Sequence, residues 1–428
     1  MIKIYPYGEV PPEGILSRRE ELPDVSGPVA EIIAAVRREG DRALSRYALA
    51  FDGAAPEELE VSPAQVAQAL KALDPQLRPV LEEAAENIRA FHSRQVRNSF
   101  VITEREGAIL GQKAVPLDRV GLYIPGGTAA YPSTVLMNAI PAKIAGCGEV
   151  VMVSPPTCGG DVDPVVLAAA GIAGVDRVFR VGGAQAVAAL AYGTESVPRV
   201  DKIVGPGNAY VAEAKRQVFG QVAIDMIAGP SEILVIADGA SDARWIAADL
   251  LSQAEHDKNA SAVLITDSPS LAQAAAREVE VQLASLPRRD IARASIENNG
   301  KIILTGNLLQ AIEIANQLAP EHLELCVDNP FDYLDKIRHA GSIFLGRSCP
   351  EALGDYLAGP NHTLPTGGTA RFSSPLSVDD FVKKSQFTYY TPAALGKAAG
   401  KIARFAREEG LEGHARSALS RLGQEVEP

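Results

Sequence analysis

The chain has 428 residues, of which 46% are hydrophobic and 22% are charged, and its formal net charge is −12. This length and composition predict a folded globular protein of two to four domains. The acidic balance, with no stretch dense in lysine and arginine, argues against nucleic acid or an anionic membrane surface as a partner. We therefore expect a small-molecule ligand.

No segment predicts membrane insertion or export. The longest apolar run, Val165 to Val175, is shorter than the about 20 residues that span a bilayer. The N-terminal sequence MIKIYPYGEV lacks the apolar core of a signal peptide. We therefore expect a cytoplasmic protein.

The cysteines predict reduced structural thiols. The chain has four of them, Cys147, Cys158, Cys326 and Cys349, and no two form a C-x-x-C pair. This spacing favours structural roles over disulfides or metal ligation. We therefore expect any metal site to use nitrogen and oxygen ligands.

The first 120 residues predict an arm followed by helices. Residues 1–20 are interrupted by proline and glycine, which indicates an arm that packs on another part of the protein. Between Val25 and Gln95, apolar residues recur every three or four positions, as in Ile32, Ile33 and Val36, and this spacing predicts surface helices.

After Pro116 the pattern changes to short apolar runs alternating with alanine-rich helical segments. The runs are RVGLYI, EVVMVSP, DRVFRVGG, DKIVGPG, EILVIAD, SAVLITD, KIILTG, HLELCV and SIFLG. This alternation predicts an α/β protein with mostly parallel sheets in two doubly wound domains. We expect one domain over residues 121–232, the other over 233–375 joined by 21–120, and a helical tail over 376–428 with no strands.

Three glycine-rich turns each follow a predicted strand and precede a predicted helix. They begin at Tyr123, Gly182 and Gly205, and the last two contain Gln185 and Asn208. Such turns present backbone N–H groups to a phosphate or nucleotide. None matches G-x-G-x-x-G, so a weak dinucleotide site and ordinary strand-to-helix turns both remain open.

Residues 241–256 predict a helix with Gln253 and His256 side by side near its end. Two nitrogen or oxygen ligands on one face could form half of a metal site. The alternative is a histidine that favours the helix C-terminus for electrostatic reasons, beside a solvated glutamine.

Glu321 and His322 precede the apolar strand LELCV, so an acid and a base stand at a strand entrance. A surface pair without function is the alternative. The stretch from Gly346 to Thr369 is too rich in glycine and proline for regular structure, and it carries Asp355 and His362. Asp355 could instead cap a short helical turn.

Ser231 stands between the two predicted domains, where a cleft between them would open. A serine in a turn is normally structural, so its position alone does not assign a function.

Several of these segments together resemble the histidinol dehydrogenase family. IDMIAGPSEILVIAD is similar to the family's signature, and LLSQAEHD, PEHLEL, GDYLAGPNHTLPT and an E-x-x-x-x-H pair near the C-terminus occur in the family's order. The resemblance runs over nearly the whole chain. It implies oxidation of L-histidinol to L-histidine through L-histidinal with two NAD, as the final step of histidine biosynthesis.

The resemblance also implies roles for individual residues. It implies one zinc ion per subunit, with Gln253, His256, Asp355 and His414 as ligands that also contact the substrate. Glu321 and His322 match the acid-base pair, and His322 also the substrate site. Ser231, His362 and Glu409 match substrate contacts, while Tyr123, Gln185 and Asn208 match NAD contacts.

The family forms a homodimer of two incomplete Rossmann-like domains per subunit, in which the C-terminal tail crosses to the partner. The resemblance therefore implies that Glu409 and His414 complete the other subunit's site. Two alternatives remain: a related zinc- and NAD-dependent alcohol dehydrogenase acting on a polyol or sulfonate, and a metal-binding protein or nucleotide sensor without turnover.

Overall fold

The computed structural model describes residues 2–18, 24–53, 55–126, 130–157 and 159–422. The chain forms two compact units. The larger unit consists of Met1–Gln95 and Leu117–Phe381, and the smaller unit of Val96–Pro116 and Val382–Pro428. None of the helices in the described part of the chain has the length and hydropathy needed to cross a membrane.

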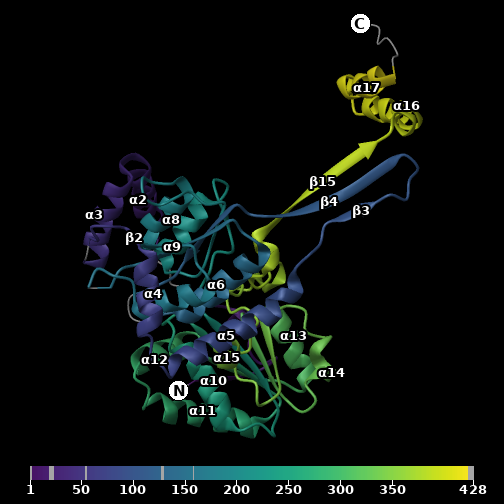
Figure 1. Cartoon of the computed structure of the whole chain (residues 1–428). Helices are drawn as coiled ribbons and strands as arrows, with labels where there is room; N and C mark the ends of the chain where they lie inside the picture. The colour runs from purple at the N-terminus through teal and green to yellow at the C-terminus, as the bar shows by residue number, and fades with distance from the viewer. Residues whose placement is uncertain (1, 19–23, 54, 127–129, 158, 423–428) are drawn as a thin grey trace. The chain divides into compact units, whose positions relative to one another are not determined.

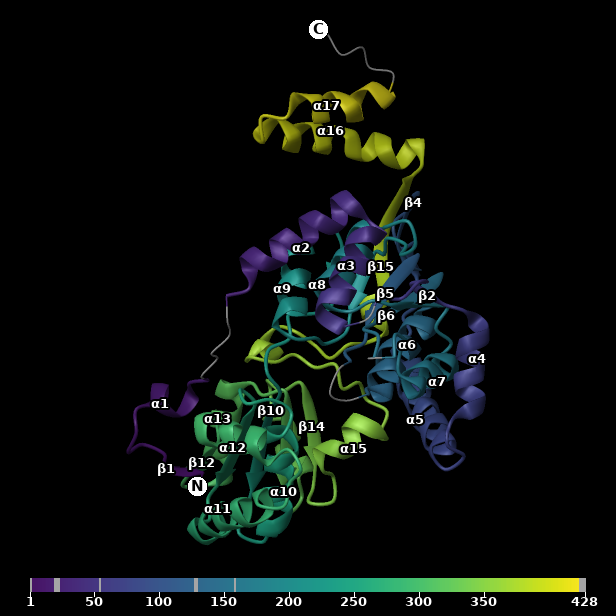
Figure 2. The same cartoon turned by 90° about the vertical axis from the view of Figure 1, so that its left-hand side faces the viewer.

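The larger unit contains two six-stranded sheets (Figures 1 and 2). In the first sheet the strands are parallel except for β2, which pairs antiparallel with β7. Its strand order is β2 (Glu60–Val61), β7 (Arg177–Arg180), β6 (Glu149–Ser154), β5 (Arg119–Tyr123), β8 (Lys202–Val204) and β9 (Ala223–Ile224).

Helices cover both faces of the first sheet, which explains why its central strands are apolar without alternation. One face packs against α4 (Pro63–Ala72), α5 (Leu77–His92), α6 (Pro132–Ala145) and α7 (Pro164–Ala173). The other packs against α2 (Ser26–Glu39), α3 (Asp41–Asp52), α8 (Gly183–Tyr192) and α9 (Ala209–Val218).

This packing corrects the expected grouping of residues 21–120 with 233–375. Ile32 and Leu44 share a core with strands of the first sheet, as do Leu81 and Ile88 on its opposite face. Sequence periodicity identifies the buried face of a helix but not the sheet that covers it.

The second sheet is parallel throughout. Its strand order is β1 (Lys3–Pro6), β12 (Lys301–Leu304), β11 (Ser261–Thr266), β10 (Glu232–Ala237), β13 (His322–Cys326) and β14 (Ser342–Leu345). The predicted N-terminal arm therefore packs on this sheet, where β1 adds an edge strand.

The helices of the second sheet also form two layers. One face packs against α10 (Ala243–Ala254), α11 (Pro269–Leu283) and α12 (Arg289–Asn298). The other packs against α1 (Pro12–Leu16), α13 (Leu308–Leu318) and α14 (Phe331–Leu334). The fold is thus α/β with two mainly parallel sheets, as predicted.

The two sheets contribute opposite edges to the region between them. The turns after β5, β7 and β8 lie at the carboxyl edge of the first sheet, where open α/β sheets normally bind ligands. In the second sheet the residues that enter β10 and β13, Ser231 and Glu321, lie at the amino edge. Both edges line one cavity, described below.

The smaller unit corrects the prediction of a purely helical tail. Its sheet is antiparallel, in the order β15 (Val382–Tyr390), β4 (Ala108–Pro116) and β3 (Phe100–Ile102). The helices α16 (Pro392–Glu408) and α17 (Glu412–Leu419) follow β15. Most of β15 is exposed on both faces, so it lacks the apolar alternation that identifies a strand.

Candidate active site

A cavity of about 480 Å³ lies between the carboxyl edge of the first sheet and the amino edge of the second. The Gly205–Asn208 turn lines it from the first sheet. The entry to strands of the second sheet, the end of α10, and α15 (Glu351–Tyr356) with the loop after it contribute most of the predicted site residues. These are Ser231, Gln253, His256, Glu321, His322, Asp355 and His362.

Gln253 and His256 line the cavity from the end of α10. Gln253 is in the last turn, and His256 lies two residues beyond it, where its N–H donates to the Gln253 carbonyl (3.1 Å). The Gln253 amide is buried, and neither its oxygen nor its nitrogen has a hydrogen-bond partner. Because an unpaired buried amide is costly, a cation bound by its oxygen would offset that cost.

Asp355 supplies a carboxylate to the same cavity from the last turn of α15. The segment 346–369, predicted to be irregular, therefore contains a short helix, and Asp355 does not cap it. Burial and the neighbouring Glu351 raise the pKa of Asp355 well above its usual range. An amide oxygen, an imidazole and a carboxylate fit a divalent cation with nitrogen and oxygen preferences.

Glu321 and His322 are both oriented by the backbone of Glu232, the first residue of the neighbouring strand β10. The Glu232 N–H donates to Glu321 Oε2 (2.8 Å), and the Glu232 carbonyl lies 2.9 Å from His322 Nδ1. A carbonyl oxygen only accepts, so Nδ1 carries the proton and Nε2 keeps its lone pair. Burial lowers the pKa of His322, which favours the neutral base.

The carboxyl of Glu321 is also buried, and burial raises its pKa well above the usual range, with the Glu232 carboxylate acting in the same direction. Glu321 Oε2 lies 3.6 Å from His322 Nδ1. The predicted adjacency of an acid and a base in one pocket is therefore present in the structure, although one residue is in the strand and the other precedes it.

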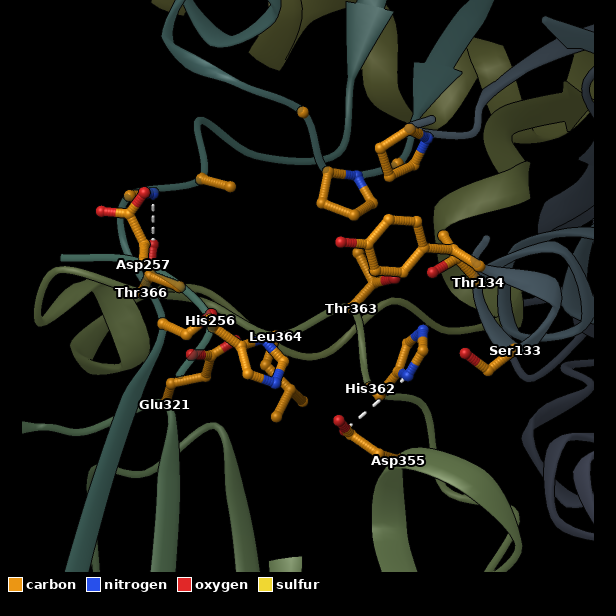
Figure 3. A pocket seen from close by; sticks show the side chains of 18 of the residues that line it. Ser133, Thr134, His256, Asp257, Glu321, Asp355, His362, Thr363, Leu364 and Thr366 are labelled. Atoms are coloured by element: carbon orange, nitrogen blue, oxygen red, sulfur yellow. Dashed lines mark hydrogen bonds and ion pairs between the residues drawn. The ribbon is translucent and has the colours of Figure 1, made fainter. Parts of the chain in front are cut away.

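His362 lies in the loop that follows α15, residues 357–368, called the return loop below, and its Nδ1 lies 3.7 Å from Asp355 Oδ1. Figure 3 shows these two side chains facing one another, with Glu321 and His256 elsewhere on the cavity wall. Burial lowers the pKa of His362 to about 4, and His322 adds to the effect. His362 is therefore neutral at pH 7 and can accept or donate a hydrogen bond.

Glu351 is a site residue that the sequence analysis missed. It is buried, and its Oε1 has no hydrogen-bond partner and lies 3.8 Å from His322 Nε2. Ligand atoms of His322, Glu351 and Asp355 lie within 4.8 Å of one another. The E-x-x-x-D spacing of Glu351 and Asp355 places both on one face of a helix, but only if the segment is helical.

A second cavity of about 470 Å³ lies at the carboxyl edge of the first sheet and is lined by Tyr123, Gln185 and Asn208. Asn208 and Gly126 line both cavities, so the two cavities adjoin. Gln185 Oε1 is buried without a partner. The Tyr123 hydroxyl accepts from the Gly183 N–H (3.0 Å), and burial raises the pKa of Tyr123 to about 12.

Asn208 has only part of its side chain available to a ligand. Its Oδ1 accepts from the N–H groups of Tyr210 and Val211 (3.1 and 3.2 Å) and so caps α9. The amide NH₂ group remains to face the cavity. Asn208 thus combines a structural oxygen with a nitrogen that can bind a ligand.

Asp52 is a further residue that the sequence analysis missed. It ends α3, lines the second cavity beside Phe51 and Ile32, and has a buried Oδ2 without a partner. Burial raises the pKa of Asp52 to about 6. Only the packing of α3 onto the first sheet brings it near Tyr123.

A buried ion pair supports the turn shared by the two cavities. Lys215 pairs with Asp225 and donates to the Gly205 carbonyl (2.9 Å), while Asp225 accepts from the Gly205 N–H (2.7 Å). Gly205 has φ of +115°, and a Cβ there would collide with the Tyr123 carbonyl oxygen. Glycine is therefore required at this position for both conformation and space.

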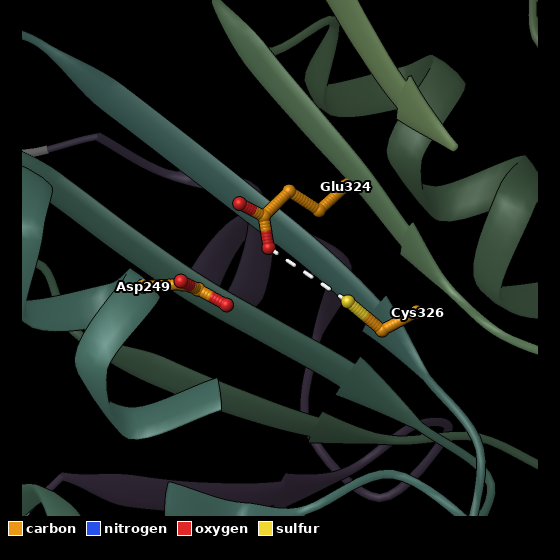
Figure 4. Close-up of side chains that lie close together, drawn as sticks. All are labelled: Asp249, Glu324 and Cys326. Atoms are coloured by element: carbon orange, nitrogen blue, oxygen red, sulfur yellow. Dashed lines mark hydrogen bonds between the residues drawn. The ribbon is translucent and has the colours of Figure 1, made fainter. Parts of the chain in front are cut away.

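Asp249, Glu324 and Cys326 form a separate group of possible ligands that lie close together (Figure 4). Cys326 Sγ donates to Glu324 Oε2 (3.8 Å), and burial raises the pKa of the thiol, as expected for an inert cysteine. Burial raises the pKa of Glu324 to about 9, and its Oε1 accepts from the Glu351 N–H (2.7 Å). This group thus holds the start of α15.

The other cysteines agree with the predicted reduced state as far as they are described. Cys147, Cys326 and Cys349 are free thiols. Cys158 lies outside the described residues.

Glu409 and His414 belong to the smaller unit. Glu409 caps the end of α16, His414 lies on α17, and both side chains are exposed. Their roles therefore remain predictions.

Comparison with known proteins identifies the family of the chain. The family model "Histidinol dehydrogenase" matches residues 16–422. A histidinol dehydrogenase of Syntrophotalea carbinolica is 57% identical over 417 residues, covering 97% of this chain and 94% of the relative. One of Halalkalibacterium halodurans is 57% identical over 397 residues, covering 93% and 94%.

A solved structure is also similar over its whole length. The crystal structure of histidinol dehydrogenase from Elizabethkingia anophelis superposes with a TM-score of 0.94 at 37% identity, covering 99% of this chain and 98% of that one. The two sheets, the segments that line the cavity and these matches together show that the chain belongs to the histidinol dehydrogenase family.

Proposed function

We propose that the cavity between the two sheets is where this chain, an NAD-dependent oxidoreductase of the final step of histidine biosynthesis, oxidises L-histidinol to L-histidine through L-histidinal. The observation that carries the proposal is the buried Glu321–His322 pair, whose two side chains are oriented by the Glu232 main chain. The Gln253 amide, which has no hydrogen-bond partner, lines the same cavity. Two NAD are consumed, because the conversion of an alcohol to an acid removes four electrons.

Gln253, His256 and Asp355 would hold a zinc ion, with His414 of the partner subunit as the fourth ligand. The unpaired Gln253 amide and the mixed oxygen and nitrogen donors support this assignment. Zinc, when bound, supplies a positive centre that holds and orients the imidazole and amine of histidinol. It has no redox role, since NAD accepts the hydride.

His322 is the base that removes the alcohol proton, because it lines the cavity and its Nε2 is left unprotonated while Nδ1 is held by Glu232. Glu321 activates the water that hydrates the aldehyde. The second oxidation needs that hydration, since hydride leaves only from a tetrahedral carbon. Because His322 and Glu321 occupy different positions, one can accept the proton of the alcohol and the other the proton of the water.

Ser231 and His362 contact the substrate within the cavity, and Glu409 recognises its ammonium group. Tyr123, Gln185 and Asn208 bind NAD in the second cavity. The lining shared by the two cavities lets NAD reach the substrate without a G-x-G-x-x-G turn.

The smaller unit crosses to the partner subunit of a homodimer, so that Glu409 and His414 complete the partner's site. Its own core supports this proposal because it is small: Ala403, Ala406 and Ala415 are its buried cluster. Large apolar side chains, including Phe387, Tyr389 and Phe405, are exposed on the same unit. Such a surface is typical of an interface.

The first experiment measures NADH formation by purified protein with NAD and L-histidinol, before and after chelation and again after zinc is returned. We expect two NADH per histidinol, loss on chelation and recovery with zinc. Zinc-loaded protein that oxidises a polyol or sulfonate but not histidinol would assign it to the related alcohol dehydrogenases.

The swap is tested by mixing two inactive variants, His322→Asn and His414→Asn, under conditions of demonstrated subunit exchange. If each site takes its tail from the partner, half of the dimers become mixed, and each mixed dimer has one intact site. Activity should then recover to about a quarter of the parent's. No recovery would indicate sites built from one chain.

A further inference from the structure

Arg18, at the end of the N-terminal arm, contacts Glu232, whose main chain orients the acid-base pair, and the segment that leads into the pair. Its Nη2 donates to Glu232 Oε2 (3.0 Å) and to the Leu318 carbonyl (2.5 Å), and its Nε lies 2.6 Å from Glu232 Oε1. Leu318 ends α13, three residues before Glu321. One guanidinium therefore joins the start of β10 to the approach to β13.

Glu232 links this contact to the site. Its side chain is buried and meets Arg18, and its Oε1 also accepts from the Gly367 N–H on the return loop (3.2 Å). Its main chain holds Glu321 through the N–H and His322 through the carbonyl. A displacement of Glu232 would therefore move both catalytic side chains together.

The charge of this contact also has a consequence for the site. Burial raises the pKa of Glu232, and Arg18 opposes that effect. Without Arg18, a buried carboxylate without a countercharge would remain beside Glu321, which costs free energy unless the segment moves or takes up a proton. Both responses would disturb the pair.

We propose that Arg18 is a positioning residue for the oxidation, which acts through Glu232 to hold Glu321 and His322 in their working geometry. This inference rests on the roles proposed above for Glu321 and His322. Arg18 does not line the cavity, so it contacts neither substrate nor metal. A misplacement of about 1 Å in an acid-base group can lower the rate on the order of 100-fold.

The test compares Arg18→Gln and Arg18→Lys with the matched control Arg371→Gln in the zinc-loaded enzyme. Arg371 also fastens the end of α13, through the Asn316 and Gln317 carbonyls (3.2 and 2.7 Å). We expect Arg18→Gln to lower kcat by about 10- to 100-fold while the KM for NAD and the zinc content stay unchanged. Arg18→Lys should restore part of kcat, and Arg371→Gln should stay within about twofold of the parent.

A double variant tests whether Glu232 mediates the effect. Arg18→Gln combined with Glu232→Gln removes the carboxylate that lost its partner, so its kcat should be higher than that of Arg18→Gln alone. If Arg18→Gln fails to fold, the partial loss of kcat in Arg18→Lys serves as the test.

Three results separate the inference from the function on which it rests. An Arg18→Gln enzyme with parental kcat, or a loss matched by Arg371→Gln, would overturn the positioning role, and so would parental kcat in Arg18→Lys where Arg18→Gln does not fold. A loss confined to the KM for NAD would also overturn it. A His322→Asn enzyme with parental kcat would instead overturn the proposed roles of the pair.

Discussion

Replacement of Asp52 by asparagine should stabilise the NAD-free protein, and the gain should depend on pH. Burial raises the pKa of Asp52 from 3.8 to about 6 in the folded state. A carboxyl whose pKa is raised by folding costs no stability below its unfolded pKa, and the cost grows as pH rises through the folded pKa. Asparagine has no charge to bury, so the variant avoids this cost.

The magnitude follows from the two pKa values. The difference of about two pH units corresponds to about 3 kcal/mol at about 1.4 kcal/mol per unit. Asp52 is only half-buried and faces a cavity, so solvent screening reduces the effect to roughly half, about 1.5 kcal/mol. The gain should be near zero at pH 4 and complete near pH 7.

The assay is denaturant unfolding of both proteins at several pH values from about 4 to about 7, without NAD, because a bound ligand would add its own stabilisation. Asp242→Asn is a control of opposite sign. Hydrogen bonds from Arg244 lower the pKa of Asp242 to about 2, so that carboxylate stays ionised throughout this range and its removal should destabilise equally at each pH. A constant Asp52→Asn effect, or one that decreases as pH rises, would refute the reasoning.

Three other predictions test the turn shared by the two cavities and the chemistry. Asn208→Asp keeps the oxygen that caps α9 but loses the NH₂ group, so it should raise the KM for NAD several-fold without loss of stability, whereas Asn208→Ala should impair both. Calorimetry and initial rates would separate the two effects. Lys215→Met leaves Asp225 as a buried unpaired charge and should cost about 3–5 kcal/mol of unfolding free energy, part of which Asp225→Asn should restore; a cost below about 1 kcal/mol in denaturant unfolding would contradict the pairing. Glu321→Gln should reduce histidine formation from added L-histidinal more than histidinal formation from histidinol, both measured by chromatography after quenching, and equal losses would exclude water activation by Glu321.

Much of the fold could be predicted from local sequence. Largely apolar runs such as Glu232–Ala237 are buried on both faces of a parallel sheet. Such a run is therefore enough to predict a buried strand. The partner of each helix could not be predicted in this way. The apolar faces of α2 to α5 could pack against either sheet, and only the tertiary structure shows that they pack against the first sheet.

The site residues also divide into those that local sequence identifies and those that only the tertiary structure reveals. Glu321, His322 and Asp355 could be identified as chemically capable groups in short segments, and the structure brings them to one cavity. Arg18 and Asp52 could not, because each acts through residues more than 70 positions away and neither belongs to a local motif. The strand β15 was missed because its exposed faces alternate too little to distinguish it from a loop.

The contacts of the Glu232 main chain with Glu321 and His322 have a consequence for how mutations at position 232 are interpreted. Every amino acid has the carbonyl oxygen that accepts from His322, and all except proline have the N–H that donates to Glu321. A scan of ordinary side-chain replacements at position 232 therefore reports on the carboxylate alone and leaves both orienting atoms in place. Loss of activity in such a scan would therefore measure the contact of the carboxylate with Arg18, and an amide-to-ester replacement made by semisynthesis would be needed to remove the donor by itself.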